Sequence, residues 1–154
     1  MGPLADLGAR MSHPRSVLVP GRPPPRGAYP HLKVVGEFVF VSGTSARRPD
    51  GVIEGAEVAA DGTVVRDIRV QTRAVLDNIA TLLGTLDLSL ADLVDVTSFL
   101  VTMDDFDGYN EVYAEYFKAE TGPARTTVAV HQLPHPHLAI EIKGTAHAGG
   151  GVAT

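Results

Sequence analysis

Two charged side chains near the end of the chain are the strongest candidates for chemistry. Arg125 follows a Gly-Pro pair and opens a β-rich run over residues 125–132, so its planar fork could hold a carboxylate through two charge-assisted hydrogen bonds. Glu141 lies in a second run, residues 137–146, where alternation places it on the face opposite its isoleucine neighbours. A carboxylate in such a strand could act as a general base. The residues alone leave the plainer interpretation open, a surface ion pair and an exposed acid.

Three histidines, His131, His135 and His137, stand close together but do not predict a metal site. The spacing of the first two suits a helix, and Pro134 and Pro136 exclude a helix there. No carboxylate or thiolate at usable spacing completes a ligand set. We therefore expect a polar loop near a pocket and no bound metal.

A basic pair, Arg47 and Arg48, follows the run over residues 39–45. The pair could neutralise an acidic ligand or remain solvated. The glycine at position 43 is not followed by Gly-Lys-Ser/Thr, so no phosphate-binding loop is predicted.

Composition excludes several classes of function. The chain has 154 residues, a formal net charge of −5 and no cysteine, which removes disulfides, thiolate ligands and cysteine nucleophiles. Four arginines and one acid give residues 1–30 a charge of +3, which leaves −8 for the remainder and does not favour binding to a nucleic acid. No apolar run approaches the roughly 18 residues that would span a bilayer, and no secretory signal is evident. We expect a cytoplasmic protein.

The chain divides into three segments. Residues 1–28 form a Pro/Arg-rich N-terminal arm, and seven of the 11 prolines fall within the first 30 residues. Residues 29–147 form the working domain, and residues 148–154 form a flexible Gly-rich tail. Whether Met1 or Met11 is the true start stays open, as does the role of the arm.

The elements that must position these side chains follow the order β-β-α-β-α-β-β, which predicts an α+β domain with the helices on one face of a mixed sheet. Asp67 is expected to cap the first helix, whose apolar positions recur at helical spacing as far as Leu86. Asp104 and Asp105 are expected to cap the second helix, whose stripe ends at Phe117. The expected strands cover residues 31–35, 38–42, 95–103, 125–132 and 137–146.

The sheet face without helices is predicted to be apolar as well. We assign Val128, Val130, Ile140 and Ile142 to it. A two-layer domain with a second apolar face usually buries that face by oligomerising.

Several segments together, in order and without large gaps, resemble the Rid family of YjgF-like reactive intermediate deaminases. The resemblance implies a chorismate-mutase-like two-layer fold, a homotrimer and active sites in the clefts between subunits. The segments that carry it are residues 40–43, 71–79, 95–100, 105–113, 122–128 and 140–142.

The resemblance also implies roles for single residues. The family's carboxylate-gripping arginine falls on Arg125, and its water-orienting acid falls on Glu141. Thr127 occupies a position that is often cysteine in relatives, so a role that needs that sulfur could not operate here. The family's other pocket positions fall on Tyr29, Ser42 and Asn110.

A narrower resemblance, over residues 42–50 and 126–138, is to the 2-aminomuconate deaminase branch. It implies cofactor-independent hydrolysis of the 2-aminomuconate enamine to the 2-oxo or 2-hydroxy dicarboxylate and ammonia, in the breakdown of aromatic compounds. The far carboxylate would need a second cation or donor set, and Arg47, Arg48, His131 and His137 are the candidates. Two alternatives stay open, a general 2-imino or enamino acid deaminase and a non-catalytic trimer that binds a small carboxylate.

Overall fold

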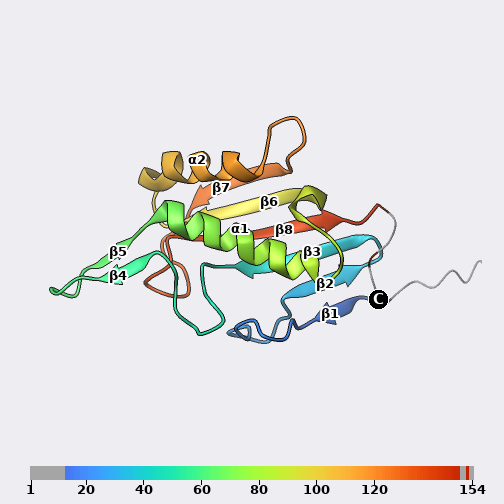
Figure 1. The fold of residues 1–154 in the computed structure, drawn as a ribbon, viewed down its shortest axis with the longest axis horizontal. Helices are drawn as coiled ribbons and strands as arrows, with labels where there is room; N and C mark the ends of the chain where they lie inside the picture. Colours follow the sequence, from blue (N-terminus) through green and yellow to red (C-terminus); the bar gives the residue numbers. More distant parts are fainter. Residues whose placement is uncertain (1–12, 150–151, 153–154) are drawn as a thin grey trace, which may run out of the picture.

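Six strands form one mixed sheet, and two helices cover a single face of it (Figure 1). The computed structural model describes residues 13–149 and residue 152. The strand order is β1-β2-β3-β8-β6-β7, with a parallel pair only between β6 and β7. This arrangement confirms the predicted α+β class. The strands are β1 (Arg15–Val17), β2 (Leu32–Val35), β3 (Phe38–Thr44), β6 (Leu93–Leu100), β7 (Ala124–Ala129) and β8 (Ile140–His147).

The first helix, α1 (Ile68–Gly84), begins where the sequence predicts. The Asp67 carboxylate accepts the backbone N–H groups of Arg69 and Val70, at 2.9 and 3.1 Å. The apolar stripe of α1 packs on the sheet, and Val75 is fully buried there. No helix within the described residues is long and apolar enough to cross a bilayer.

The second helix, α2 (Phe106–Tyr116), is capped differently from the prediction. The hydroxyl of Thr102 accepts the N–H of Asp104 at 3.1 Å and starts a short 3-10 turn, Met103–Asp105. Asp105 already has helical backbone angles, so its side chain makes no capping bond. The preceding strand therefore ends at Leu100, three residues earlier than predicted.

The assignment of Ile140 and Ile142 to the uncovered sheet face was wrong. Both are completely buried in the core between the sheet and the helices. Alternation along β8 separates Glu141 from its isoleucine neighbours, but it does not tell which set faces the helices. The other face is nevertheless apolar in part, since large side chains remain 45, 46 and 38% exposed at Phe38, Phe40 and Val128.

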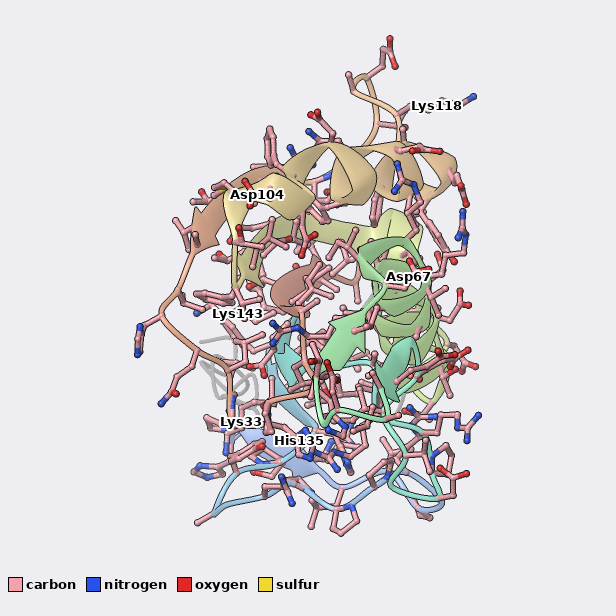
Figure 2. The ribbon with its side chains drawn as sticks, turned by 90° about the vertical axis from the view of Figure 1, so that its left-hand side faces the viewer. Lys33, Asp67, Asp104, Lys118, His135 and Lys143 are labelled. Atoms are coloured by element: carbon pink, nitrogen blue, oxygen red, sulfur yellow. The ribbon has the colours of Figure 1, made fainter. Side chains whose placement is uncertain are left out.

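Figure 2 shows the two faces from the side, with Lys143 of β8 projecting away from α1. Glu141 lies two residues before Lys143 on the same strand, and the two therefore share the face that the helices leave open.

A second, two-stranded sheet lies between β3 and α1. Its strands are β4 (Ala56–Val58) and β5 (Val64–Arg66), and they extend beyond the main sheet as a hairpin (Figure 1). Between β3 and this hairpin, Arg47 forms an isolated bridge with Ile53, and the turn that joins them passes through Gly51.

The described part of the N-terminal arm packs against the domain. β1 pairs with β2 at one edge of the main sheet. The His31 ring accepts the N–H of Val19 at 2.9 Å through Nδ1, and Nε2 donates to the carbonyl of Pro23 at 2.9 Å. One neutral imidazole therefore holds both ends of the segment between Val19 and Pro23.

Candidate active site

A pocket of about 110 Å³ opens beside the end of β3, where four parts of the chain meet. Its walls come from the arm, from β3 and the loop that follows, from α1, and from the loop and strand around β8. Four residues predicted for the site line this pocket together, namely Tyr29, Ser42, Arg47 and Glu141.

Glu141 is the acid of this pocket. The ladder between β3 and β8 changes register between Val41 and Thr44, so Gly43 lies in an irregular part of the strand. A side chain at Gly43 would overlap the Glu141 carboxylate, whose carbon is 3.0 Å from the Cβ position. Burial raises the pKa of Glu141, and no cation in the described chain forms an ion pair with it. A carboxylate with a raised pKa is suited to take a proton from water.

Two polar side chains of α1 fix the walls of the pocket. The Asn78 amide donates to the carbonyls of Ser45 and Arg47, at 2.9 and 3.2 Å. The fully buried Gln71 donates to the carbonyl of His137 and accepts the N–H of Ala139, both at 2.8 Å. The helix thus holds the loop after β3 and the loop before β8 in place.

Ser42 has a positioning role in the structure. Its hydroxyl donates to the carbonyl of Pro30 at 2.7 Å, and its N–H donates to the carbonyl of His31 at 3.1 Å. These bonds tie β3 to the segment that carries Tyr29 into the pocket.

Arg125 lies elsewhere, under the aromatic side of α2. It pairs with Val96 across the parallel ladder, on the helix-covered face. Its guanidinium carbon lies 6.0, 5.0 and 4.6 Å from the ring centroids of Phe106, Tyr109 and Tyr113. Rings at these distances attract the cation.

Two buried hydroxyl groups without hydrogen-bond partners among the described residues lie in the region of Arg125. The oxygens of Tyr113 and Thr127 are buried without a hydrogen-bond partner within the described structure. Burial raises the pKa of Tyr113 to about 12, so this phenol stays a hydrogen-bond donor at neutral pH. Asn110 lies on α2, one residue after Tyr109. We call Tyr113, Arg125 and Thr127 the α2–β7 cluster, a set of donors suited to an anionic ligand.

The two predicted catalytic residues, Arg125 and Glu141, are therefore not brought together within one chain. Arg125 pairs with Val96 and Glu141 with Phe99, on either side of β6. Two strand spacings and three residues along the strand separate their Cα atoms by roughly 14 Å, and their side chains leave opposite faces of the sheet.

The remaining predicted residues lie outside the pocket lining. Arg48 forms an exposed ion pair with Asp50 at 3.2 Å. His131 is exposed in the segment after β7. The His137 ring stacks edge-on against His135, with centroids 4.7 Å apart.

Several pocket residues were not anticipated from the sequence, and three of them carry polar side chains that bear on ligand binding. Arg22 and Arg26 come from the arm, and Asn78 comes from α1. The signal for the arginines was present, since both lie within eight residues of Tyr29 and no acid accompanies them. Asn78 carried no signal beyond its place in a resembling segment.

One family model and several known proteins are similar to most of this chain. A family model described as Endoribonuclease L-PSP matches residues 20–148. A RutC family protein of Pyrococcus horikoshii is 40% identical over 126 residues, which cover 81% of this chain and 90% of that protein. The 3-aminoacrylate deaminase RutC of Acinetobacter baylyi is 36% identical over 135 residues, or 87% of this chain and 98% of that enzyme.

Solved structures agree in fold. The yeast protein YEO7 has a TM-score of 0.74 at 29% identity, covering 87% of this chain and 98% of that one. A Yersinia pestis protein of the conserved Rid family has a TM-score of 0.71 at 29% identity, with the same coverage. From the matched family model and these relatives, the chain belongs to the Rid family of YjgF-like proteins.

Proposed function

We propose that this protein is a deaminase that hydrolyses imines or enamines of small carboxylates, with 2-aminomuconate as its substrate. The observation that carries the proposal is the Glu141 carboxylate, which is desolvated, lies against Gly43 and faces a pocket. A general base placed next to bound water needs these features. The Acinetobacter relative supports the substrate class, because 3-aminoacrylate in its name is an enamine of a carboxylate.

The active site is assembled from two copies of the chain. Glu141 of one copy and the α2–β7 cluster of a neighbour would form one site, since these groups face away from each other within a chain. The partly exposed Phe38, Phe40 and Val128 supply an apolar face for such an association, and the homotrimer typical of the family is the assembly we propose.

The reaction needs only these groups and water. The enamine takes a proton from solvent at carbon and its nitrogen gives one proton up, which produces an imine whose carbon is electrophilic. Arg125 holds the adjacent carboxylate, which fixes the imine for attack. A water oxygen bonds to the imine carbon while Glu141 takes one water proton and returns it to the nitrogen. The hydroxyl proton of the carbinolamine then passes through Glu141 to the nitrogen, the C–N bond breaks as C=O forms, and ammonia leaves.

RNA is disfavoured as a substrate, although the family model is described as an endoribonuclease. The sequence after residue 30 carries a net charge of −8, and nucleic-acid affinity depends on contacts between cations and phosphates.

Ammonia release from freshly generated 2-aminomuconate and from 2-iminopropionate tests the proposal. The wild-type protein is expected to prefer 2-aminomuconate, and Arg125→Ala is expected to lower kcat/KM by about 100-fold or more through loss of two charge-assisted bonds. Arg125→Lys keeps the charge but not the fork, so it should recover little of this loss.

Three results would count against parts of the proposal. Equal turnover of both substrates would favour the general imino acid deaminase. Ligand binding without any ammonia release would favour the non-catalytic trimer. Full activity of a folded Arg125→Ala protein would remove Arg125 from the site.

A further inference from the structure

We propose that Arg22 and Arg26 of the N-terminal arm, together with Arg47, form an anion subsite that takes the second carboxylate of a dicarboxylate substrate. This inference rests on the proposed function, because it places the subsite in the same pocket as Glu141. It gives the arm a role, and it adds Arg22 and Arg26 to Arg47, the one candidate from the sequence analysis that lines this pocket.

The three arginines converge on one pocket. Arg22, Arg26 and Arg47 all line it, although Arg47 lies 21 residues beyond Arg26 in the sequence. None of them forms an ion pair with a carboxylate in the described chain. Glu141 is the acid of the pocket, and no arginine charge contributes to its pKa shift. The arginines thus leave a positive region that no residue of the pocket neutralises.

The arginines also affect one another. Burial lowers the pKa of Arg47, and the guanidinium of Arg26 lowers it further. Burial lowers the pKa of Arg22 as well. The partial burial of Arg22 and Arg47 and the like charge of Arg26 near Arg47 are unfavourable for the empty protein, and a bound anion offsets both costs. A carboxylate or phosphate is the chemistry that planar guanidinium groups recognise best.

The same positive field reaches the loop before β8. The pKa of His135 is lowered by burial, by His137 and by the charges of Arg47 and Arg26. Figure 2 shows His135 at the same end of the molecule as the blue ribbon of the arm. His135 therefore stays neutral at neutral pH, and the arginines carry the charge of the subsite.

The arm is held in a fixed geometry. One N–H of Arg22 donates to the Asn78 amide oxygen at 2.6 Å, and the same Asn78 amide holds the carbonyl of Arg47 at 3.2 Å. His31 fixes the arm on either side through Val19 and Pro23. The prolines at positions 23–25 restrict the backbone between Arg22 and Arg26. Preorganised cations lose little conformational entropy when a ligand binds.

The size of the pocket indicates a small ligand. About 110 Å³ within one chain accommodates a small ligand. A short chain with its reacting carbon beside Glu141 and its far carboxylate beside the arginines matches this volume and this charge distribution.

Calorimetric titration with two matched ligands tests the inference. Muconate and hexa-2,4-dienoate share a six-carbon diene chain and differ by one carboxylate in place of a methyl group. Arg26→Ala and Arg22→Ala are each expected to weaken muconate binding by about tenfold or more and to leave hexadienoate binding unchanged. Arg26→Gln, which keeps much of the side-chain volume, should behave like Arg26→Ala. Arg15→Ala removes the same charge from the same arm outside the pocket, and it should bind both ligands as the wild type does.

The outcomes separate this inference from the proposed function. If the pocket variants weaken both ligands equally or neither ligand, or if wild type binds both ligands with the same affinity, the subsite is overturned. Loss of turnover in Arg125→Ala would still support the deaminase in that case. If wild type releases no ammonia from any imine but Arg26→Ala selectively weakens muconate binding, the subsite stands and the proposed function fails.

Discussion

Arg22 and Asn78 lie 56 residues apart in the sequence, and a guanidinium N–H of Arg22 donates to the Asn78 amide oxygen at 2.6 Å. Asn78 belongs to α1 and also donates to the carbonyls of Ser45 and Arg47. One amide therefore connects the arm, the helix and the loop after β3. All three parts contribute walls to the pocket that contains Glu141.

Replacing Asn78 should loosen the arm and disturb the far-carboxylate subsite without touching Glu141. Asn78→Ala removes one bond to Arg22 and two to the loop after β3, so we expect muconate affinity to fall by about tenfold. Hydrogen exchange at residues 19–29 should become faster. Thr81→Ala changes an exposed residue of the same helix and serves as the control. Unchanged exchange and unchanged affinity in Asn78→Ala would contradict this account.

The rate of hydrolysis should depend on pH through Glu141. The carboxylate must be ionised to take a proton from water, and burial raises its pKa, so kcat should fall on acidification at a pH above the ordinary carboxyl range. Glu141→Gln should lower kcat by about 100-fold or more and abolish this acid limb. Measurement of kcat across the pH range, with the unfolding temperature as the control for folding, checks both points. An identical acid limb in Glu141→Gln would assign it to another group.

Glu141 should also make the stability of the protein depend on pH. Ionisation of Glu141 raises kcat, but it should lower the free energy of unfolding. A carboxyl whose pKa is raised on folding contributes stability below its unfolded pKa, and that contribution is lost as pH rises through its folded pKa. Glu141→Gln does not titrate, so it should be more resistant to urea than wild type at about pH 8 and gain nothing at about pH 3.5. Glu57→Gln on β4 removes an exposed carboxylate and controls for the change in net charge. If wild type and Glu141→Gln had the same stability to urea at both pH values, the burial of Glu141 would have no energetic cost.

Mixing two inactive variants should restore activity if the site is shared between copies. Arg125→Ala protomers keep Glu141, and Glu141→Gln protomers keep Arg125. If equal amounts of the two variants reassemble at random into trimers, about a quarter of the sites would contain both intact residues. The mixture should then show about a quarter of wild-type activity. Each variant alone, taken through the same unfolding and refolding, is the control. No recovery in verified mixed trimers would mean that the two residues do not act in one shared site.

The aromatic setting of Arg125 depends on a buried hydrogen bond. Ser98 and Tyr109 are fully buried, and their hydroxyl oxygens lie 2.6 Å apart. Tyr109→Phe would leave the Ser98 hydroxyl unsatisfied and should cost about 1 to 3 kcal/mol of unfolding free energy. The double variant Ser98→Ala/Tyr109→Phe should recover part of this loss, which urea unfolding can measure. If the losses of unfolding free energy in the two single variants simply added in the double variant, the hydrogen bond between Ser98 and Tyr109 would be contradicted.

Elements with a local signal could be predicted from the sequence. The Asp67 cap and the apolar stripe after it located α1, and alternation in β8 placed Glu141 opposite Ile140 and Ile142. The same alternation could not tell which face the helices cover, because that choice depends on how both helices pack. The cap of α2 differed because the hydroxyl of Thr102 could accept an N–H bond earlier in the chain.

The candidate site could be predicted only as a set of residues. The sequence suggests that Arg125 and Glu141 act together. Their pairing with β6 shows that the two side chains lie on opposite faces of the sheet within one chain. The contribution of Arg22 and Arg26 was hidden because a segment rich in proline and arginine resembles a linker. Its packing depends on distant partners, His31 and Asn78.

The anchoring of the arm through His31 has a consequence for how such proteins could diverge. Two of the three arginines of the proposed subsite, Arg22 and Arg26, lie on a short segment before β2, whereas the proposed base lies on β8. Exchange of residues 19–28 between relatives that keep His31 and Asn78 would therefore transplant ligand preference while the hydrolytic machinery stays intact. Preference and turnover would then be free to evolve as separate traits.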